Sequence, residues 1–499
     1  MISIFRIRVS SSIQIPVLFL LALVSFFILS PWKSPFLNSD NAVHILMTYD
    51  CQLPNDLYFW GQDRLGSFIP VFGHLLFSVL KLSPALAASI ALYSVLFATV
   101  LLLSVFLDRA ISRLLLAILI FFPLHQMDYL LRLGHPYASQ FFFIALGLFC
   151  LKKSGYKKDM LSYLFLAGGT GSFMMALWSS DMTIVAFLAL MICLCCMFIL
   201  DKKSLLERIA SFRISAGIVL LMALLGIGFV LYAKSVSRPV ASYNTTWMGS
   251  KENILNGARK YFHVFTHILG GWQGMLSALH HWLMVVLSLL LARIFWLYIK
   301  TRNKQISVLA LFFFLNFLGG ECLMLLSKWV ALNNFNGWYQ TYPYISLMLC
   351  LLVMADKALT DRAGILLNTC LAVLLVSSAF SEIRIYRLKI NRDFNERSLS
   401  ELKDLQNLGH CGIIGDYWHS YLPAALNPEL IKATPYEDGR SERCTDSVMT
   451  CEKIYLIKDA WLEKFPDEYN AYGRTLYFSK DSIKLSDWEL GLYLRRKKE

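Results

Sequence analysis

The sequence predicts a polytopic, all-α bundle of membrane-spanning helices followed by a small soluble α/β domain. Hydrophobic residues make up 57% of the 499 residues, charged residues make up only 16%, and the mean hydropathy is +0.53. Soluble globular domains carry about 25% charged and about 45–50% apolar residues. This chain therefore has more apolar surface than one aqueous core can bury, which is typical of a membrane protein.

The charged residues divide the chain into two units. Residues 1–380 hold 28 Lys and Arg and 14 Asp and Glu, a net charge of +14, whereas residues 381–499 hold 19 and 20, a net charge of −1. We therefore expect a transmembrane unit over 1–380 and a soluble unit over 381–499. The soluble unit lacks the basic balance of a nucleic-acid-binding domain, so nucleic acid is not an expected partner.

Eleven apolar segments approach the length of about 20 residues that a helix needs to cross a bilayer. They are 13–30, 85–107, 111–127, 137–151, 161–178, 182–200, 214–233, 282–299, 306–326, 342–355 and 363–380. The apolar segment 66–82 is short and is interrupted by Pro70, Gly73 and His74. If it crossed the membrane, every later basic loop would change sides. We therefore expect an interfacial or re-entrant helix at 66–82.

The positive-inside rule also predicts the orientation in the cytoplasmic (inner) membrane. The N-terminus and the short basic loops are expected in the cytoplasm. The first loop, the loops 234–281 and 327–341, and the whole C-terminal unit are then extracytoplasmic. Any site built from these parts opens to the outer face.

The C-terminal unit reads as alternating strands and helices. Short apolar runs predict strands at 412–415, 453–457 and 475–478, and helical patterns fall at 418–426 and 460–470. This alternation favours a small α/β domain.

Two cysteines of this unit, Cys444 and Cys451, lie close together in the sequence. Outside the cytosol they are candidates for a disulfide. The cysteines in and near the apolar segments are expected to pack as small hydrophobic residues.

Carboxylates near the outer helix ends mark candidate functional positions. Asp128, Asp181 and Glu321 lie at or just inside the ends of predicted spans, where a charged group is costly. Asp128, Arg132 and His135 follow one another at i, i+4 and i+7, which places them on one helical face. Both a plain Asp–Arg ion pair and a functional site are compatible with this spacing.

The first outer loop carries the most specific sequence. It begins Asn38-Ser39-Asp40-Asn41, and the stretch 58–67 reads Tyr-Phe-Trp-Gly-Gln-Asp-Arg-Leu-Gly-Ser directly before the interfacial segment. An interfacial aromatic belt with glycine turns is one interpretation of this stretch. Two carboxylates, an amide and an arginine close together favour a binding site instead.

The predicted outer loop 234–281 contains both basic and aromatic residues, which suits contact with lipid phosphates at the membrane surface. His263 and His267 stand at i and i+4 in this loop. They suit a metal only if a third ligand exists, and interfacial histidines are the alternative.

These stretches resemble the C-type (GT-C) superfamily of membrane glycosyltransferases, which use lipid-phosphate-linked sugars. The likeness lies in Asp40 shortly after the first helix, in the 58–67 stretch before a juxtamembrane helix, and in the strand-then-Asp416-Tyr417-Trp418 element of the C-terminal unit. One departure concerns the Arg-Tyr pair that many relatives carry at the start of a late helix. Here residues 338–342 read Trp-Tyr-Gln-Thr-Tyr, without an arginine.

The resemblance implies a role for each candidate site residue. Asp40 is the expected catalytic base, and Asp128 is the expected second carboxylate, which in some relatives is a metal ligand. A divalent metal ion is therefore a possible cofactor. Residues expected to bind the donor phosphate or the substrate are Arg64, Gln62, Asp63, Arg132, His135 and Tyr342.

Such a site transfers a sugar from a polyprenyl-phosphate donor to an envelope acceptor, which is a glycolipid, polysaccharide or protein. The reaction needs a base on the acceptor hydroxyl and positive charge for the departing phosphate. Two alternatives share the outer carboxylates: a transporter or flippase for an amphipathic envelope precursor, and a non-enzymatic assembly scaffold. Many transporters carry repeated halves, and we find no internal repeat in this sequence.

Overall fold

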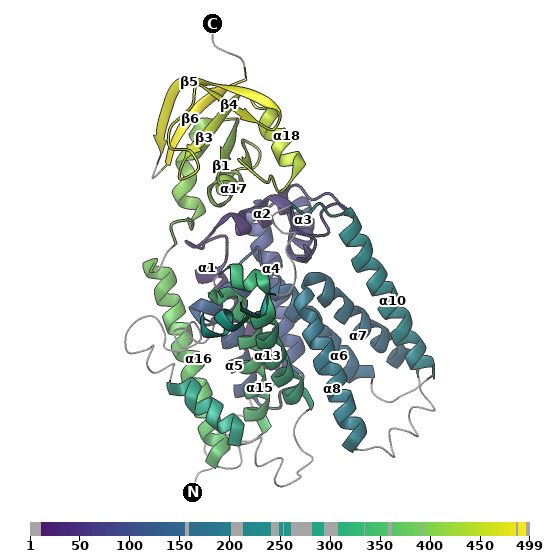
Figure 1. The fold of residues 1–499 in the computed structure, drawn as a ribbon. Helices are drawn as coiled ribbons and strands as arrows, with labels where there is room; N and C mark the ends of the chain where they lie inside the picture. Colours follow the sequence, from purple (N-terminus) through teal and green to yellow (C-terminus); the bar gives the residue numbers. More distant parts are fainter. Residues whose placement is uncertain are drawn as a thin grey trace.

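The computed structural model describes residues 11–154, 159–200, 213–240, 249–252, 254–260, 282–293, 308–333, 335–357, 362–390, 393–485 and 488–495. A bundle of long helices carries a domain built on a β-sheet at one end (Figure 1). The expected division into a helical unit and a terminal sheet unit is therefore present.

The long helices of the bundle coincide with the apolar segments of the sequence. They are α1 (Ser11–Leu29), α4 (Pro84–Ser104), α5 (Ala110–Phe121), α6 (Tyr137–Ser154), α7 (Met160–Ser179), α8 (Ile184–Leu200), α10 (Arg213–Val236), α13 (Val308–Leu326), α15 (Thr341–Lys357) and α16 (Arg362–Leu388). A further apolar helix covers Trp282–Arg293. Five described helices are long and apolar enough to cross a membrane by length and composition. The number of eleven spans stays a prediction.

Local sequence signals set the ends of these helices. Ser83 caps α4 by accepting a hydrogen bond from the Leu86 amide, and Pro84 occupies the first helical position. Asp159 caps α7 in the same way. The helix α5 ends at Phe121, two residues before Pro123, which is the stop that a following proline favours.

The loop that the sequence predicts to be the first outer loop contains two short helices. The helix α2 (Ser39–Tyr49) begins at a reciprocal cap in which Asn38 and Asn41 bond to each other's backbone amides. The helix α3 (Phe68–Leu80) has 13 residues and ends at Lys81 in a left-handed conformation. At about 1.5 Å per residue it is too short to cross a bilayer. It lies beside α2 at the end of the bundle that carries the sheet (Figure 1).

Shorter elements connect the long helices at this end. They are the 3-10 helices η1 (His125–Leu130), η2 (Asp181–Thr183), η4 (Gly337–Gln340) and η5 (Leu399–Leu408) and the short helix α14 (Lys328–Leu332). Several of them supply residues to the candidate site.

The C-terminal domain is a six-stranded mixed sheet in the order β2-β1-β3-β6-β5-β4. Its elements are β1 (Cys411–Gly415), α17 (Tyr417–Leu426), β2 (Ile431–Pro435), α18 (Glu442–Thr450), β3 (Lys453–Lys458), β4 (Glu468–Ala471), β5 (Arg474–Leu485) and β6 (Trp488–Leu494). The strand β1 pairs in parallel with β2 and β3, whereas β3, β6, β5 and β4 pair in antiparallel fashion. Three predicted strands and the helix at 418–426 are confirmed.

The predicted helix at 460–470 is wrong. Residues 459–467 form turns, and β4 follows at Glu468–Ala471. Pro466 explains the difference, since proline has no amide proton to donate inside a helix. The second helix of the domain is α18, which lies earlier in the sequence.

Cys444 and Cys451, the candidates for a disulfide, are both free in the structure. Cys444 belongs to α18, and Cys451 follows the last residue of this helix. The Cys451 thiol donates to the backbone carbonyl of Ser447 at 3.4 Å. This places the thiol against the helix rather than in a covalent bridge.

The two units are joined through a continuous apolar core and a backbone pairing. Buried apolar residues form one cluster from the bundle to Ile413 and Leu490 in the sheet. The helix α16 continues through residue 380, the predicted domain boundary, to Leu388. Leu37 and Arg397 then exchange both backbone hydrogen bonds, at 3.1 and 2.8 Å. The C-terminal domain is thereby tied to the start of the first outer loop.

Candidate functional site

Asp40 lies in the first turn of α2. Here the predicted first outer loop meets the C-terminal domain and the loop 122–136 between α5 and α6, which we call the second outer loop. Its neighbour Asn41 donates its side-chain amide to the backbone carbonyl of Leu133 in the second outer loop. Gly134 follows with a φ of +82°, and a Cβ there would lie 2.7 Å from the carbonyl carbon and Cβ of Asp40. Only glycine permits this backbone conformation together with this close approach.

His44, one helical turn after Asp40, also holds α2 against the second outer loop. Its Nδ1 accepts a hydrogen bond of 2.8 Å from the Gly134 amide, so the ring is neutral and carries its proton on Nε2. Burial lowers the pKa of His44 to about 3. The second outer loop is therefore held against the Asp40 face of α2 by a neutral buried histidine.

The C-terminal domain contributes two side chains above Asp40. The Tyr417 hydroxyl, at the start of α17, donates a hydrogen bond to Asp40 Oδ1. The Arg440 guanidinium stacks on the Tyr417 ring at 4.5 Å and lies close enough to act on the Asp40 charge. Arg440 also packs against Gly61, where a Cβ would lie 2.7 Å from Arg440 Cδ.

The electrostatic environment of Asp40 combines opposing effects. Burial raises the pKa of Asp40, while the hydrogen bond from Tyr417 and the charge of Arg440 lower it in part. The balance is a pKa above the ordinary value of an aspartate. A carboxylate in this state is a stronger base than an exposed one, which suits proton abstraction near neutral pH.

Arg64 lies on a second side of the site. Its guanidinium stacks over the Trp329 ring at 4.6 Å. Burial raises the pKa of Tyr339 to about 12, and the charges of Arg64 and Asp40 act on this hydroxyl in opposite directions. Tyr339 therefore connects Arg64 electrostatically with Asp40.

The neighbours of Arg64 in the sequence take different positions. Gln62 lies in the turn after Trp60, and its backbone amide donates to Phe59 at 2.9 Å. Asp63 and Arg64 both act on the charge of Asp181, which pairs with Lys234 at 3.7 Å. The stretch 58–67 meets the C-terminal domain at Gly61, against which Arg440 packs.

Asp128 belongs to a buried network beneath this region. Its Oδ2 accepts hydrogen bonds from Arg132 Nε at 2.9 Å and from the Tyr386 hydroxyl at 3.0 Å. Arg132 Nη1 donates to Glu396 at 2.7 Å, so the guanidinium neutralises two carboxylates. The expected Asp128–Arg132 pair is present, and it is an ion pair buried between the bundle and the C-terminal domain.

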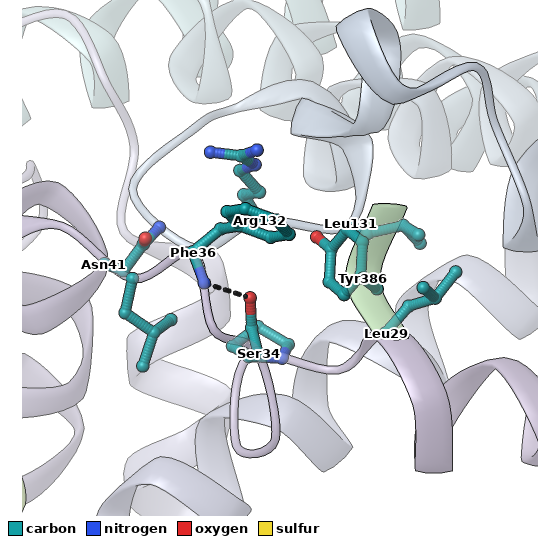
Figure 2. Close-up of a pocket in the computed structure, with 9 residues that line it drawn as sticks. Leu29, Ser34, Phe36, Asn41, Leu131, Arg132 and Tyr386 are labelled. Carbon is teal, nitrogen blue, oxygen red and sulfur yellow. Dashed lines mark hydrogen bonds between the residues drawn. The ribbon is translucent and has the colours of Figure 1, made fainter. Parts of the chain in front are cut away.

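A small pocket opens beside this network. Asn41 lies on one side of the pocket and Tyr386 on the other, with Phe36 between them (Figure 2). Arg132 also lines the pocket. Ser34, another lining residue, accepts a hydrogen bond at Oγ from the Phe36 backbone amide. The pocket therefore lies between the first turn of α2 and the outer end of α16.

The structure does not bring all the predicted residues to Asp40. His135 packs between the Tyr129 and Tyr137 rings, with centroids at 4.8 and 6.0 Å. Burial and nearby Arg132 and His44 lower the pKa of His135 to about 3. Tyr342 is fully buried in α15 and donates its hydroxyl to Asn316 at 2.5 Å. His263 and His267 lie outside the described residues.

The structure adds residues that the sequence did not single out. Arg440 and Tyr339 join Asp40, and Tyr417 comes from the Asp-Tyr-Trp element. Glu382 and His125 lie beside Asp128, and His125 Nδ1 is 3.1 Å from Glu382 Oε2. The sequence does hold a signal that could have identified Glu382, because it is an acidic residue near the end of an apolar helix. The boundary at residue 380 left it outside the predicted transmembrane unit.

Two groups of described residues have the composition of a metal site. They are His125, Asp128 and Glu382, and Asp416, His419 and Asp459. In each group the potential ligand atoms lie within 4.8 Å of one another. The first group adjoins the Asp128 network, and the second lies in the C-terminal domain.

The helical bundle with its terminal sheet domain has the fold of a solved membrane-protein structure. The chain is similar to the crystal structure of ArnT from Cupriavidus metallidurans bound to undecaprenyl phosphate, with a TM-score of 0.53 and 8% identity over 98% of this chain and 99% of that chain. The apo state of ArnT has a TM-score of 0.49 and 10% identity over 97% and 98%. No protein-family model and no curated protein sequence match this chain.

Proposed function

We propose that this chain is a membrane glycosyltransferase that moves a sugar from a polyprenyl-phosphate donor to an envelope acceptor at the outer face of the cytoplasmic membrane. The observation that carries the proposal is the convergence on Asp40 of Gly134 from the second outer loop and of Tyr417 and Arg440 from the C-terminal domain. The fold shared with ArnT, and the undecaprenyl phosphate bound to that protein, support the same assignment.

In this proposal Asp40 is the base. It accepts the proton of the acceptor hydroxyl as the oxygen attacks the anomeric carbon and the bond from that carbon to the phosphate oxygen breaks. The polyprenyl phosphate leaves with the bonding electrons, so it needs positive charge and no general acid. Tyr417 fixes one carboxylate oxygen of Asp40 and leaves the other for the acceptor.

The departing phosphate requires cations near Asp40. Arg440 and Arg64 are the candidates, because both act on the Asp40–Tyr339 region and both are partly buried beside aromatic rings. Gln62 and Asp63 are proposed to shape the wall that holds Arg64. Arg132 already faces two carboxylates, so we assign it to positioning the outer loops rather than to the phosphate.

The resemblance implies a divalent cation at Asp128, and the local residues fit one. Asp128 Oδ1 and Glu382 Oε1 are buried without hydrogen-bond partners, and His125 lies beside both residues. These three side chains would hold the ion. A bound cation would supply positive charge to the Asp128 and Glu382 carboxylates and so stabilise the network that positions the outer loops.

Full-length protein in proteoliposomes tests the proposal. The probes are a panel of undecaprenyl-phosphate-linked radiolabelled sugars with an envelope lipid extract as acceptor, and binding of undecaprenyl phosphate is measured in parallel. Asp40→Asn is expected to lower transfer by about 10²–10⁴-fold while binding is retained, since this is the usual contribution of a general base. The exposed Asp404→Asn is the matched control.

Each other outcome has a defined meaning. Unchanged transfer by Asp40→Asn removes the base assignment. Movement of the labelled lipid across the bilayer without transfer favours the transporter. Full complementation of a deletion strain by Asp40→Asn favours the scaffold.

A further inference from the structure

Three side chains of the C-terminal domain converge at the start of α17, away from the membrane. Asp416 caps the helix by accepting the His419 amide at 2.8 Å, His419 lies in the first turn, and Asp459 follows β3. The His419 side chain is 3% exposed, and the carboxylates of Asp416 and Asp459 are 26% and 19% exposed. The site is thus largely enclosed with one open side at the two carboxylates.

Both carboxylates face the same ring nitrogen. His419 Nδ1 lies 2.6 Å from Asp459 Oδ2 and 3.0 Å from Asp416 Oδ1. One ring nitrogen carries at most one proton, so it cannot donate fully to two carboxylates at once. Burial lowers the pKa of His419, but the hydrogen bonds and charges of Asp416 and Asp459 outweigh it and raise the pKa, so the imidazolium balances part of their charge.

Among the described residues, no lysine or arginine adds to this charge balance. In the part of the C-terminal domain that the structure describes, neither Asp416 nor Asp459 pairs with a lysine or arginine side chain. The remaining contacts hold the three groups in place. Asp459 Oδ1 accepts the Ala460 amide at 2.6 Å, and the His419 ring meets the edges of the Phe394 and Trp488 rings at 5.4 and 5.7 Å.

We propose that Asp416, His419 and Asp459 form a divalent-cation site that takes Zn²⁺. One imidazole nitrogen and two carboxylate oxygens, with an open position for water, are a donor set that zinc accepts. All three ligand atoms lie within 4.8 Å of one another, so small side-chain shifts bring them to coordinating distance.

The site has a structural consequence for α17. Asp416 immediately precedes Tyr417, whose hydroxyl reaches Asp40. A cation between Asp416 and Asp459 would tie the first turn of α17 to the end of β3 and hold Tyr417 in position. The inference of a metal site rests on these contacts alone and does not depend on the glycosyltransferase proposal.

Tag-free, full-length protein in detergent tests the site. The protein is treated with chelator, titrated with Zn²⁺ and analysed for bound metal per chain and for thermal stability. We expect Asp459→Asn and His419→Gln each to bind one equivalent of Zn²⁺ fewer than the wild type and to lose the corresponding rise in Tm. The exposed Asp467→Asn in the same domain is the control and is expected to match the wild type.

Counting equivalents separates this site from any ion at His125, Asp128 and Glu382, which the variants leave intact. Size-exclusion profiles establish that each variant is folded, and two different substitutions guard against a local defect in one of them. Equal zinc stoichiometry in the wild type and in both folded variants would overturn the proposal, whatever their transferase activity. The three residues would then be a hydrogen-bonded anchor for α17.

Discussion

The Tyr417 hydroxyl donates a hydrogen bond to Asp40 Oδ1, although the two residues are 377 positions apart in the sequence. The donor belongs to the C-terminal domain, and the acceptor belongs to the first outer loop. The C-terminal domain therefore forms part of the proposed active site. Its contribution is measurable through the titration of Asp40.

Tyr417→Phe is expected to move the acid limb of the kcat/KM profile to higher pH. Burial raises the pKa of Asp40, and the hydrogen bond from Tyr417 and the charge of Arg440 lower it. Loss of the hydrogen bond raises the pKa further, so the active, ionised base is lost at a higher pH as the solution is acidified. A hydrogen bond of about 0.5–1.5 kcal/mol corresponds to a shift of about half to one pH unit.

Tyr477→Phe in β5 is the control for this profile, because it removes a hydroxyl from the same domain without touching Asp40. Tyr339 and Arg440 also act on the site and remain in both variants. An unchanged acid limb in Tyr417→Phe would show that Asp40 is not the titrating base.

Arg440→Ala and Arg64→Ala are expected to raise the KM for the lipid-phosphate donor. A hydrogen bond between charged groups contributes about 1.5–3 kcal/mol, which corresponds to about 10- to 100-fold in affinity. The measurement is made above the acid limb, so that protonation of Asp40 does not contribute. Lys453→Ala, at an exposed position of β3, is the matched loss of a cation. If only kcat falls, the arginines do not bind the ground-state phosphate.

Gly134→Ala is expected to lower both thermal stability and transfer. The residue combines a φ of +82° with a backbone contact to Asp40 that leaves no room for a Cβ. Gly473→Ala is a close control, since Gly473 has a φ of +74° but open space around it. The left-handed conformation alone costs about 1–2 kcal/mol. A larger fall in Tm and a loss of activity confined to Gly134→Ala would identify the contact with Asp40 as the cause.

Arg132→Ala is expected to destabilise the protein by about 3–5 kcal/mol, because it leaves Asp128 and Glu396 buried without their cation. Thermal unfolding in detergent measures the change. Lys458→Ala removes one partner of the exposed pair with Glu489 and is expected to cost about 0–1 kcal/mol. Equal shifts in Tm for the two variants would contradict the buried role of Arg132.

The helical architecture was predictable from the sequence for a simple physical reason. A backbone in hydrocarbon must satisfy its own hydrogen bonds, so long apolar segments form helices. The helix start at Ser83-Pro84 and the pair Asp128–Arg132 were readable from local spacing as well. Such features depend only on residues within a few positions of one another.

The composition of the site was less predictable, because it depends on contacts between distant residues. No local pattern links Arg440 to Asp40 or Tyr386 to Asp128. Tyr342 is a second example. Its position in the sequence suggested a ligand contact, which stays a prediction, and its hydroxyl donates to Asn316 in α13. Burial of a polar group inside a helical bundle is decided by packing partners that the sequence does not identify.

The exchange of backbone hydrogen bonds between Leu37 and Arg397 limits how this protein can be divided or recombined. Leu37 lies three residues before Asp40. The segment that carries the aspartate therefore begins at a backbone pairing with the linker 393–398, which precedes the C-terminal domain. We expect a chain truncated before residue 393 to lose this pairing, whereas a chain that ends just before β1 keeps Arg397. A chimera with a foreign terminal domain would need to keep the linker 393–398 of this chain, because Arg397 in that linker makes the backbone hydrogen bonds to Leu37.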